Sequence, residues 1–176
     1  MRYKEGDMAI QEYMTVNLIT VRPNDSVWYA LKMLRSHEIR HLPVIQGKRL
    51  VGLISDRDFR QMLPSSLATP EEQDQFRAWG PQVKVSEVMT RKILTVTPET
   101  RAGKAARLMV EHRIGCLPVV RGSTLIGIIT TVDLLRAMAG EDQPRNRDSK
   151  KTTSRRPKSL EDRRTPRAEG KKLHRS

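Results

Sequence analysis

Hydrophobic residues recur at helical spacing in two stretches of the chain, and each stretch predicts an amphipathic helix with one buried face. The first stretch is Val27, Ala30, Leu31 and Leu34, and the second is Ala102, Ala105, Ala106, Met109 and Val110. Asp25 or Ser26 is the expected N-cap of the first helix, and Thr100 is the expected N-cap of the second.

Shorter apolar segments surround these helices and predict β-strands. Two of them, residues 19–21 and 94–96, precede the helices and are stopped by prolines. Four buried runs follow the helices in pairs, each joined by a short turn with a glycine: 42–45 with 50–54, and 117–120 with 125–129. Further helices are expected directly after each pair, at 56–62 and 131–138.

The same order of elements occurs twice because the chain contains an internal duplication. When the sequence is shifted by 75 positions, residues 14–58 match residues 89–133 at 16 of 45 positions without a gap. Each copy predicts a β-α-β-β-α unit of about 55 residues, too small to bury both faces of its sheet alone. The predicted fold class is therefore α/β (α+β), with two repeats packed as a pseudo-twofold pair that bury their sheet faces against each other.

The expected domain boundaries follow from this duplication. The first repeat spans residues 8–64 and the second spans 83–140, with a linker at 65–82 that contains a short polar helix. We expect Trp79, in this linker, to be a packing anchor rather than a binding residue.

The charge of the chain is concentrated at its C-terminal end. The whole chain has 33 Lys and Arg against 20 Asp and Glu, a formal net charge of +13, and residues 141–176 hold 13 of the basic and 6 of the acidic side chains. This segment has three apolar side chains and several prolines, so we predict a disordered basic tail. The tail is either a solubilising extension or an electrostatic arm for nucleic acid or another polyanion.

The composition argues against several functional classes. The apolar runs are far shorter than the ~20 residues of a membrane-spanning helix, and the N-terminus shows no apolar signal segment. The single cysteine, Cys116, gives neither a disulfide framework nor a CxxC metal site, so we expect a small buried hydrophobe and a cytoplasmic protein. The four histidines form no spaced metal cluster, and His37 and His112 are expected at helix C-termini. Because no catalytic motif is found, we predict a protein that is not an enzyme and needs no cofactor.

Two sets of motifs at the 75-residue spacing indicate a family. The first copy reads Tyr-Met-Thr at 13–15, Arg-His-Leu-Pro-Val at 40–44 and Gly-Leu-Ile-Ser-Asp-Arg-Asp at 52–58, and the second reads Val-Met-Thr at 88–90, Gly-Cys-Leu-Pro-Val at 115–119 and Gly-Ile-Ile-Thr-Thr-Val-Asp at 127–133. With these motifs the chain resembles a tandem CBS domain pair, or Bateman module, over about residues 8–140. It also resembles the stand-alone bacterial pairs of the acetoin-utilisation type.

The resemblance implies a regulatory sensor that binds an adenosine-containing ligand in clefts between the repeats and signals to an effector protein. Such pairs bind AMP, ADP, ATP, S-adenosylmethionine or dinucleotides, and two pairs commonly assemble as a disc-like homodimer. The family's [Ser/Thr]-x-x-Asp motif falls on Ser55 with Asp58 and on Thr130 with Asp133. A carboxylate can accept both hydrogens of a ribose diol, and a hydroxyl at a helix start can cap the helix and donate to a phosphate.

Further ligand-binding candidates come from the strands of both copies. They are Thr20, Val21, Arg40, His41, Pro43 and Arg57 in the first copy and Thr95, Val96, Gly115, Cys116 and Pro118 in the second. By analogy with the family, the adenine would lie against the valines and prolines of this set.

The Ser/Thr-x-x-Asp motifs also have a purely structural interpretation, because such a motif between a strand and a helix can serve only as an N-cap. Their occurrence twice in the same register favours a ligand role in at least one copy. The two clefts are expected to differ, since the first copy has Arg40 and Arg57 where the second has Gly115 and Val132. Arginine binds phosphate through two parallel bonds and keeps its charge, so the cleft with the first-copy residues is predicted to prefer the more phosphorylated ligand.

Overall fold

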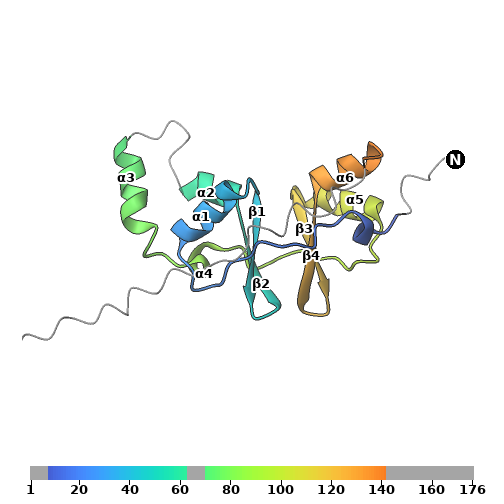
Figure 1. Ribbon diagram of the computed structural model, residues 1–176, viewed down its shortest axis with the longest axis horizontal. Helices are drawn as coiled ribbons and strands as arrows, with labels where there is room; N and C mark the ends of the chain where they lie inside the picture. Colours follow the sequence, from blue (N-terminus) through green and yellow to red (C-terminus); the bar gives the residue numbers. More distant parts are fainter. Residues whose placement is uncertain (1–7, 63–69, 142–176) are drawn as a thin grey trace, which may run out of the picture. The chain divides into compact units, whose positions relative to one another are not determined.

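The computed structural model describes residues 8–62 and 70–141, which contain the predicted helices and hairpins and two short helices that were not predicted (Figure 1). In chain order the elements are η1 (Ile10–Glu12), α1 (Val27–Ser36), β1 (His41–Gln46), β2 (Arg49–Ser55), α2 (Asp56–Met62), α3 (Pro70–Trp79), α4 (Val85–Val88), α5 (Ala102–His112), β3 (Cys116–Arg121), β4 (Thr124–Thr130) and α6 (Thr131–Met138). The predicted tail, apart from Glu141, lies outside the described residues.

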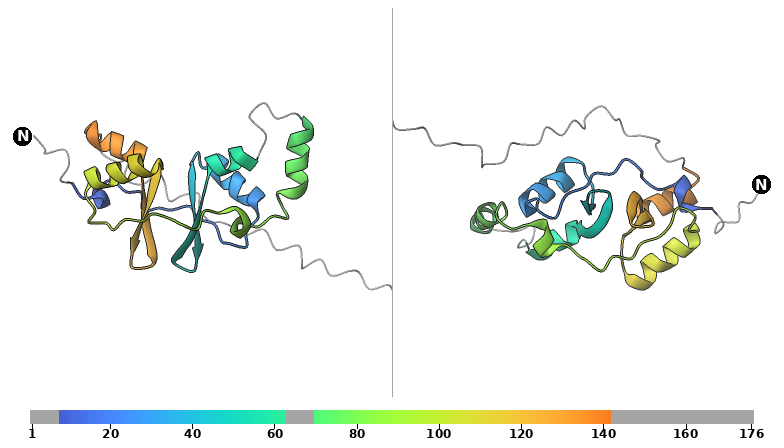
Figure 2. Two further views of the ribbon diagram at one scale, coloured as in Figure 1. Left: turned by 180° about the vertical axis from the view of Figure 1, so that it is seen from behind. Right: turned by 90° about the horizontal axis from the view of Figure 1, so that it is seen from below.

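The four strands form one sheet in the order β1-β2-β4-β3, and neighbouring strands are antiparallel. β1 with β2, and β3 with β4, form two hairpins as predicted. Gly47 and Gly122 lie in the turns of these hairpins. Their φ values of 64° and 62° fall in the left-handed region, which glycine adopts without strain. The hairpins join where Arg49 lies opposite Thr124. In each repeat, the helix that follows the hairpin starts at the end away from its turn (Figure 2).

The predicted strands at 19–21 and 94–96 form only a single parallel bridge each. Val21 bridges to Val44, and Val96 bridges to Val119. The Val21 and Val96 side chains are 1% and 6% exposed, so both segments pack against the sheet although neither extends into a full strand.

Each repeat has its own hydrophobic core, and the two repeats form the predicted pair within one sheet. The first core contains the four predicted α1 residues with Leu42, Val44, Ile54 and Phe59, and the second contains Ala105, Met109, Leu117, Val119, Ile129 and Leu134. Val110 was predicted on the buried face of α5 but is 77% exposed. Successive helix positions are about 100° apart, and Val110 therefore points away from the core that Met109 enters.

The expected helix caps are confirmed for α1 and wrong for α5. Ser26 is the N-cap of α1, and its hydroxyl accepts a bond from the Tyr29 N–H at 3.2 Å. The N-cap of α5 is Arg101, because Thr100 lies one residue earlier, where its hydroxyl accepts from the Thr97 N–H at 3.1 Å. The histidine prediction is confirmed, since His37 is the C-cap of α1 and His112 is the last residue of α5.

The N-terminal segment of the first repeat packs on the second repeat. The Ile10 N–H donates to the Thr100 carbonyl at 2.8 Å, and Thr15 exchanges two backbone bonds with Ile128 of β4. The Ile10 side chain is 0% exposed and belongs to the second core. Figure 1 shows this blue segment beside α5 and β4.

The N-terminal segment of the second repeat packs on the first repeat in the same way. The Val85 N–H donates to the Asp25 carbonyl at 2.8 Å, and Thr90 exchanges two backbone bonds with Leu53 of β2. The Val85 side chain is 0% exposed and belongs to the first core. Since Val85 is the equivalent of Ile10 in the 75-residue register, the two repeats exchange equivalent segments.

Two glycines inside the strands make room for this exchange. A Cβ atom added to Gly52 would lie 2.9 Å from the Met89 Cγ, and one added to Gly127 would lie 2.7 Å from the Met14 sulfur. A side chain at either strand position would therefore force the methionine of the exchanged segment to move.

The helix predicted in the linker is confirmed as α3, which ends at Trp79. The Trp79 ring packs edge-on to Phe76 with ring centres 4.8 Å apart, and Phe76 in turn lies 5.5 Å from the Trp28 ring of α1. Trp79 therefore packs as predicted. Within 8–62 and 70–141, no helix combines the length and apolarity needed to cross a membrane.

Candidate ligand-binding site

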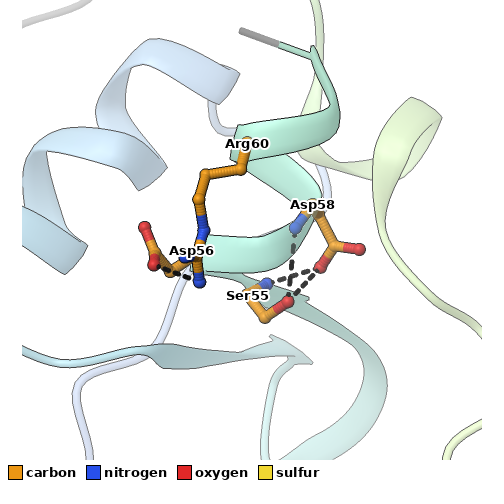
Figure 3. Close-up of polar contacts among 4 residues, drawn as sticks. All are labelled: Ser55, Asp56, Asp58 and Arg60. Atoms are coloured by element: carbon orange, nitrogen blue, oxygen red, sulfur yellow. Dashed lines mark hydrogen bonds and ion pairs between the residues drawn. The ribbon is translucent and has the colours of Figure 1, made fainter. Parts of the chain in front are cut away.

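The first Ser/Thr-x-x-Asp motif lies at the junction of β2 and α2. Oδ2 of Asp58 accepts bonds from the Ser55 N–H and the Ser55 hydroxyl, both at 2.7 Å, and the Asp58 N–H donates to the Ser55 Oγ at 3.4 Å (Figure 3). This reciprocal pair is a capping box. No residue in the described ranges donates a hydrogen bond to the other carboxylate oxygen of Asp58, which leaves that oxygen able to accept.

The second motif repeats this arrangement at the junction of β4 and α6. Oδ2 of Asp133 accepts from the Thr130 N–H at 2.8 Å and from the Thr130 hydroxyl at 2.7 Å, and the Asp133 N–H donates back at 3.3 Å. Asp133 is only 7% exposed, whereas Asp58 is half-buried. Both carboxylates are thus held in place by their own helix caps.

The first motif lies beside the start of β1. His41 is directly opposite Ser55 in the sheet, and the Asp56 N–H donates to the Arg40 carbonyl at 2.9 Å. The Asp56 carboxylate also pairs with Arg60 at 2.9 Å (Figure 3), but both side chains are well exposed, so the pair adds little stability. Arg40 is also exposed, so a guanidinium group is accessible beside this motif.

The second motif lies beside the start of β3, with different side chains. Cys116 is opposite Thr130, and the Thr131 N–H and hydroxyl contact the Gly115 carbonyl at 3.0 and 3.3 Å. Thr131 was not among the predicted site residues, although it lies within the motif, directly after Thr130. The repeat register could have identified it as the equivalent of Asp56.

One contact brings the two sets of residues together. A Cβ atom added to Gly115 would lie 3.3 Å from both Cε1 and Nε2 of His41, so the imidazole of the first repeat rests against the backbone of the second. The two predicted residues therefore meet across the boundary between the repeats.

Burial changes the acid–base properties of two site residues. Burial and the neighbouring Arg40 charge lower the pKa of His41, and outweigh the opposite effect of Asp58 and Asp56. Burial raises the pKa of Cys116 to about 12, and its side chain is 3% exposed. The thiol therefore stays protonated at neutral pH, and Cys116 is a small buried hydrophobe, as predicted.

The lowered pKa of His41 predicts a pH-dependent stability. Because the folded protein disfavours the imidazolium, the unfolded chain binds more protons as the pH falls below about 6.5. The contribution of His41 to the free energy of unfolding is complete above that pH. It is lost as the pH falls toward the lower pKa that His41 has in the folded protein. We expect the thermal midpoint of the natural protein to fall more than that of His41→Gln between pH 7.5 and 5.5. Equal decreases would contradict this prediction.

The remaining predicted residues divide into buried and accessible groups. Val21, Val96, Pro43 and Pro118 are buried. Their side chains pack inside the two repeats, whereas Arg57 and Thr95 are exposed and Thr20 is half-buried. Among the described residues, no group of three His, Cys, Asp or Glu side chains could hold a metal ion.

Comparison with known sequences identifies the family. The CBS domain profile matches residues 10–65 and 85–140, which are the two repeats with their N-terminal segments. The chain belongs to the CBS domain family. It carries two copies of the domain, in agreement with the resemblance seen in its motifs.

Two curated relatives show how such a pair occurs in other proteins. Over 125 residues the chain is 34% identical to inosine-5'-monophosphate dehydrogenase of Korarchaeum cryptofilum, covering 70% of this chain but only 23% of the enzyme. Over 126 residues it is 29% identical to CBS domain-containing protein YhcV of Bacillus subtilis, covering 72% of this chain and 82% of YhcV. A CBS pair can therefore be a small part of an enzyme or nearly a whole protein.

Three solved CBS structures are similar to this chain. CBSX2 in complex with AMP is 32% identical, with a TM-score of 0.63 and coverage of 75% of this chain and 96% of CBSX2. The MJ0100 CBS pair with 5-methylthioadenosine and S-adenosylmethionine is 26% identical, with a TM-score of 0.63 and coverage of 76% and 97%. The acetoin utilization protein AcuB of Vibrio cholerae is 27% identical, with a TM-score of 0.63 and coverage of 76% and 91%.

Proposed function

We propose that this CBS pair binds an adenosine-containing ligand, either AMP, ADP or ATP or S-adenosylmethionine, in the clefts between its repeats. It is a regulatory module rather than an enzyme, and it passes its ligand state to an effector protein. The proposal is carried by the two equivalent capping boxes, which hold Asp58 and Asp133 in place. These boxes lie next to the contact between His41 and Gly115 that joins the repeats.

The chemistry of a ribose suits these carboxylates. Each Oδ2 atom is already fixed by bonds from its own Ser or Thr, so little side-chain freedom is lost when a ligand arrives. A charged carboxylate is a strong acceptor for the two hydroxyl hydrogens of a ribose diol. A ligand that contacts both repeats binds some of their relative orientations more tightly than others. It therefore shifts the population toward the orientation that it binds most tightly.

The wider role follows from the family. CBSX2 in complex with AMP and MJ0100 with S-adenosylmethionine support a regulatory ligand rather than a catalytic cofactor. We further propose a cytoplasmic homodimer of this chain.

A ligand panel tests the proposal directly. AMP, ADP, ATP, S-adenosylmethionine and NAD are added to the full chain in thermal-shift and calorimetric titrations, with GMP as the control without adenine. At 100 times its dissociation constant, a ligand specific for the folded state adds about 2.7 kcal/mol, or roughly 5–10 °C in the thermal midpoint. A panel in which no adenosine derivative produces heat or a shift would refute the proposal.

Arg40 is expected to select the phosphorylated ligand. Its side chain is exposed beside the first capping box. The equivalent position in the second repeat is Gly115, which has no side chain to bind phosphate. Arg40→Ala should weaken ATP binding by about tenfold and AMP binding less, because a charge-assisted bond to phosphate is lost. Arg60→Ala removes an equal charge nearby and should leave both affinities unchanged. If Arg40→Ala bound ATP as tightly as the natural protein, Arg40 would not contact the ligand.

A second candidate function rests on the charge of residues 141–176. With 13 basic against 6 acidic side chains, this segment could bind nucleic acid by releasing counterions from the phosphates. Binding to duplex DNA that weakens steeply with salt, and that is lost when residues 141–176 are deleted, would support this function. A nucleotide-induced thermal shift without DNA binding would support the sensor alone.

A further inference from the structure

A hollow of about 380 Å³ lies along α1 of the first repeat, the helix that Figures 1 and 2 show between the sheet and α3. Residues at intervals of three and four line it, because such residues share one face of a helix. They are Trp28, Leu31, Lys32, Arg35 and Ser36, and we call this site the α1 hollow. Leu31 belongs to the first core, whereas the other four side chains are exposed.

The Trp28 ring is held in place although it is 38% exposed. Its centre lies 5.5 Å from that of the Phe76 ring of α3, and Phe76 is 3% exposed. The Trp28 backbone N–H donates to the Gly80 carbonyl at 3.1 Å, so the end of the linker also fixes the start of α1. A fixed ring of this kind offers a ligand an apolar surface and loses little side-chain freedom when the ligand binds.

Two cations lie beside this apolar surface. Lys32 and Arg35 are exposed and three residues apart, about one helical turn. Among the described residues, neither side chain forms an ion pair with a carboxylate. A guanidinium can bind a carboxylate through two parallel bonds, and the ammonium group adds a second positive charge. The α1 hollow therefore suits a molecule that joins an apolar ring to an anionic group.

The second repeat has no equivalent of this surface. In the 75-residue register, the five lining positions are Gly103, Ala106, Arg107, Val110 and Glu111. None of these residues is aromatic, and the carboxylate of Glu111 lies one turn from the single cation, Arg107. The combination of an exposed ring and two unpaired cations is therefore particular to α1 and does not follow from the duplicated backbone.

We propose that the α1 hollow binds a small aromatic carboxylate, whose ring packs on Trp28 and whose carboxylate is bound by Lys32 and Arg35. Ligand pockets usually enclose about 300–1,000 Å³, so the 380 Å³ of this hollow suits a molecule of one or two rings. No lining residue belongs to a capping box or to the contact between His41 and Gly115. The site is thus separate from the proposed adenosine clefts and does not depend on them.

The first test titrates naphthalene-2-carboxylate into the full chain by calorimetry, with naphthalene-2-methanol as the uncharged analogue of similar shape. The carboxylate should bind at one site per chain and at least about tenfold more tightly than the alcohol, because only the carboxylate forms charge-assisted bonds. Equal affinity for the two compounds, or no binding of the carboxylate, would overturn the proposal.

Variants of the two cations test their role in this preference. The double variant Lys32→Ala, Arg35→Ala should bind the carboxylate and the alcohol equally. Both side chains are exposed, so its thermal midpoint should be preserved. Arg107→Ala removes the exposed cation of α5 that is equivalent to Lys32, and it should keep the natural preference. A double variant that kept the natural preference would show that these cations do not bind the carboxylate.

The second test locates the bound carboxylate by the amide NMR signals of the full chain. Signals of residues 28–36 should shift and those of residues 103–111 should not, and an excess of AMP should not displace the compound. Displacement by AMP would place the compound in an adenosine cleft and overturn the proposal. If the signals of residues 28–36 responded to protein concentration but not to the carboxylate, the hollow would instead be a contact between copies of the chain.

Discussion

Replacing Ile10 by alanine is expected to destabilise the second repeat by about 2–5 kcal/mol, although Ile10 belongs to the N-terminal segment of the first repeat. Its side chain is 0% exposed inside the second core, and its N–H is bonded to Thr100. The truncation leaves a cavity under α5. Hydrogen exchange should therefore become faster in β3 and β4, while β1 and β2 keep more of their protection.

Val85→Ala provides the matched experiment, because Val85 occupies the equivalent position in the first core. It removes two methyl groups, so we expect about 2 kcal/mol of destabilisation and faster exchange in β1 and β2. Val16→Ala is the control in the N-terminal segment, since Val16 is 59% exposed and should change stability by less than about 0.5 kcal/mol. If Ile10→Ala loosened the first repeat instead, the exchange of segments would not hold in solution.

Loss of charge at the two capping boxes is expected to remove most of the ligand affinity. In Asp58→Asn and Asp133→Asn, the amide oxygen can still accept the capping bonds, so the helices should form with a loss of about 1 kcal/mol or less. A hydrogen bond from a ribose hydroxyl to a charged acceptor contributes about 1.5–3 kcal/mol, which corresponds to a loss of about 10- to 100-fold in affinity.

Calorimetry on each variant assigns the affected cleft, with Asp56→Asn as the charge-matched control. Asp56 lies two residues before Asp58, is bonded to Arg60 at the surface, and should not change the affinity when neutralised. If both capping-box variants bound the ligand as well as the natural protein, Asp58 and Asp133 would serve only as helix caps. The clefts would then need other residues to hold a nucleoside.

Much of the local structure could be predicted because it depends on short-range patterns. The helices α2 and α6 have the predicted bounds, since each directly follows a buried run and begins at a capping box. The two hairpins follow from glycines that adopt positive φ between β-prone runs. The capping boxes themselves could be recognised from the spacing of Ser or Thr and Asp alone.

The errors lie where a residue's surroundings depend on distant parts of the chain. Val110 continues the apolar spacing of α5, but its exposure depends on how α5 is rotated over the sheet. Thr100 is a residue type that is favoured at N-caps, but it lies one residue before the N-cap, and its hydroxyl accepts a hydrogen bond from the Thr97 N–H. The contact between His41 and Gly115 joins the two repeats, and no local pattern contains it.

The sequence by itself determined that two equivalent units exist, which elements they contain, and where their Ser/Thr-x-x-Asp motifs stand. The tertiary structure decided which copy completes which core. Ile10 and Val85 are equivalent in the duplication, and the two cores that receive them are also equivalent. Each segment would therefore find similar apolar contacts on its own repeat and on the other one. Local interactions therefore favour neither arrangement, and the three-dimensional path of the chain places each segment on the opposite repeat.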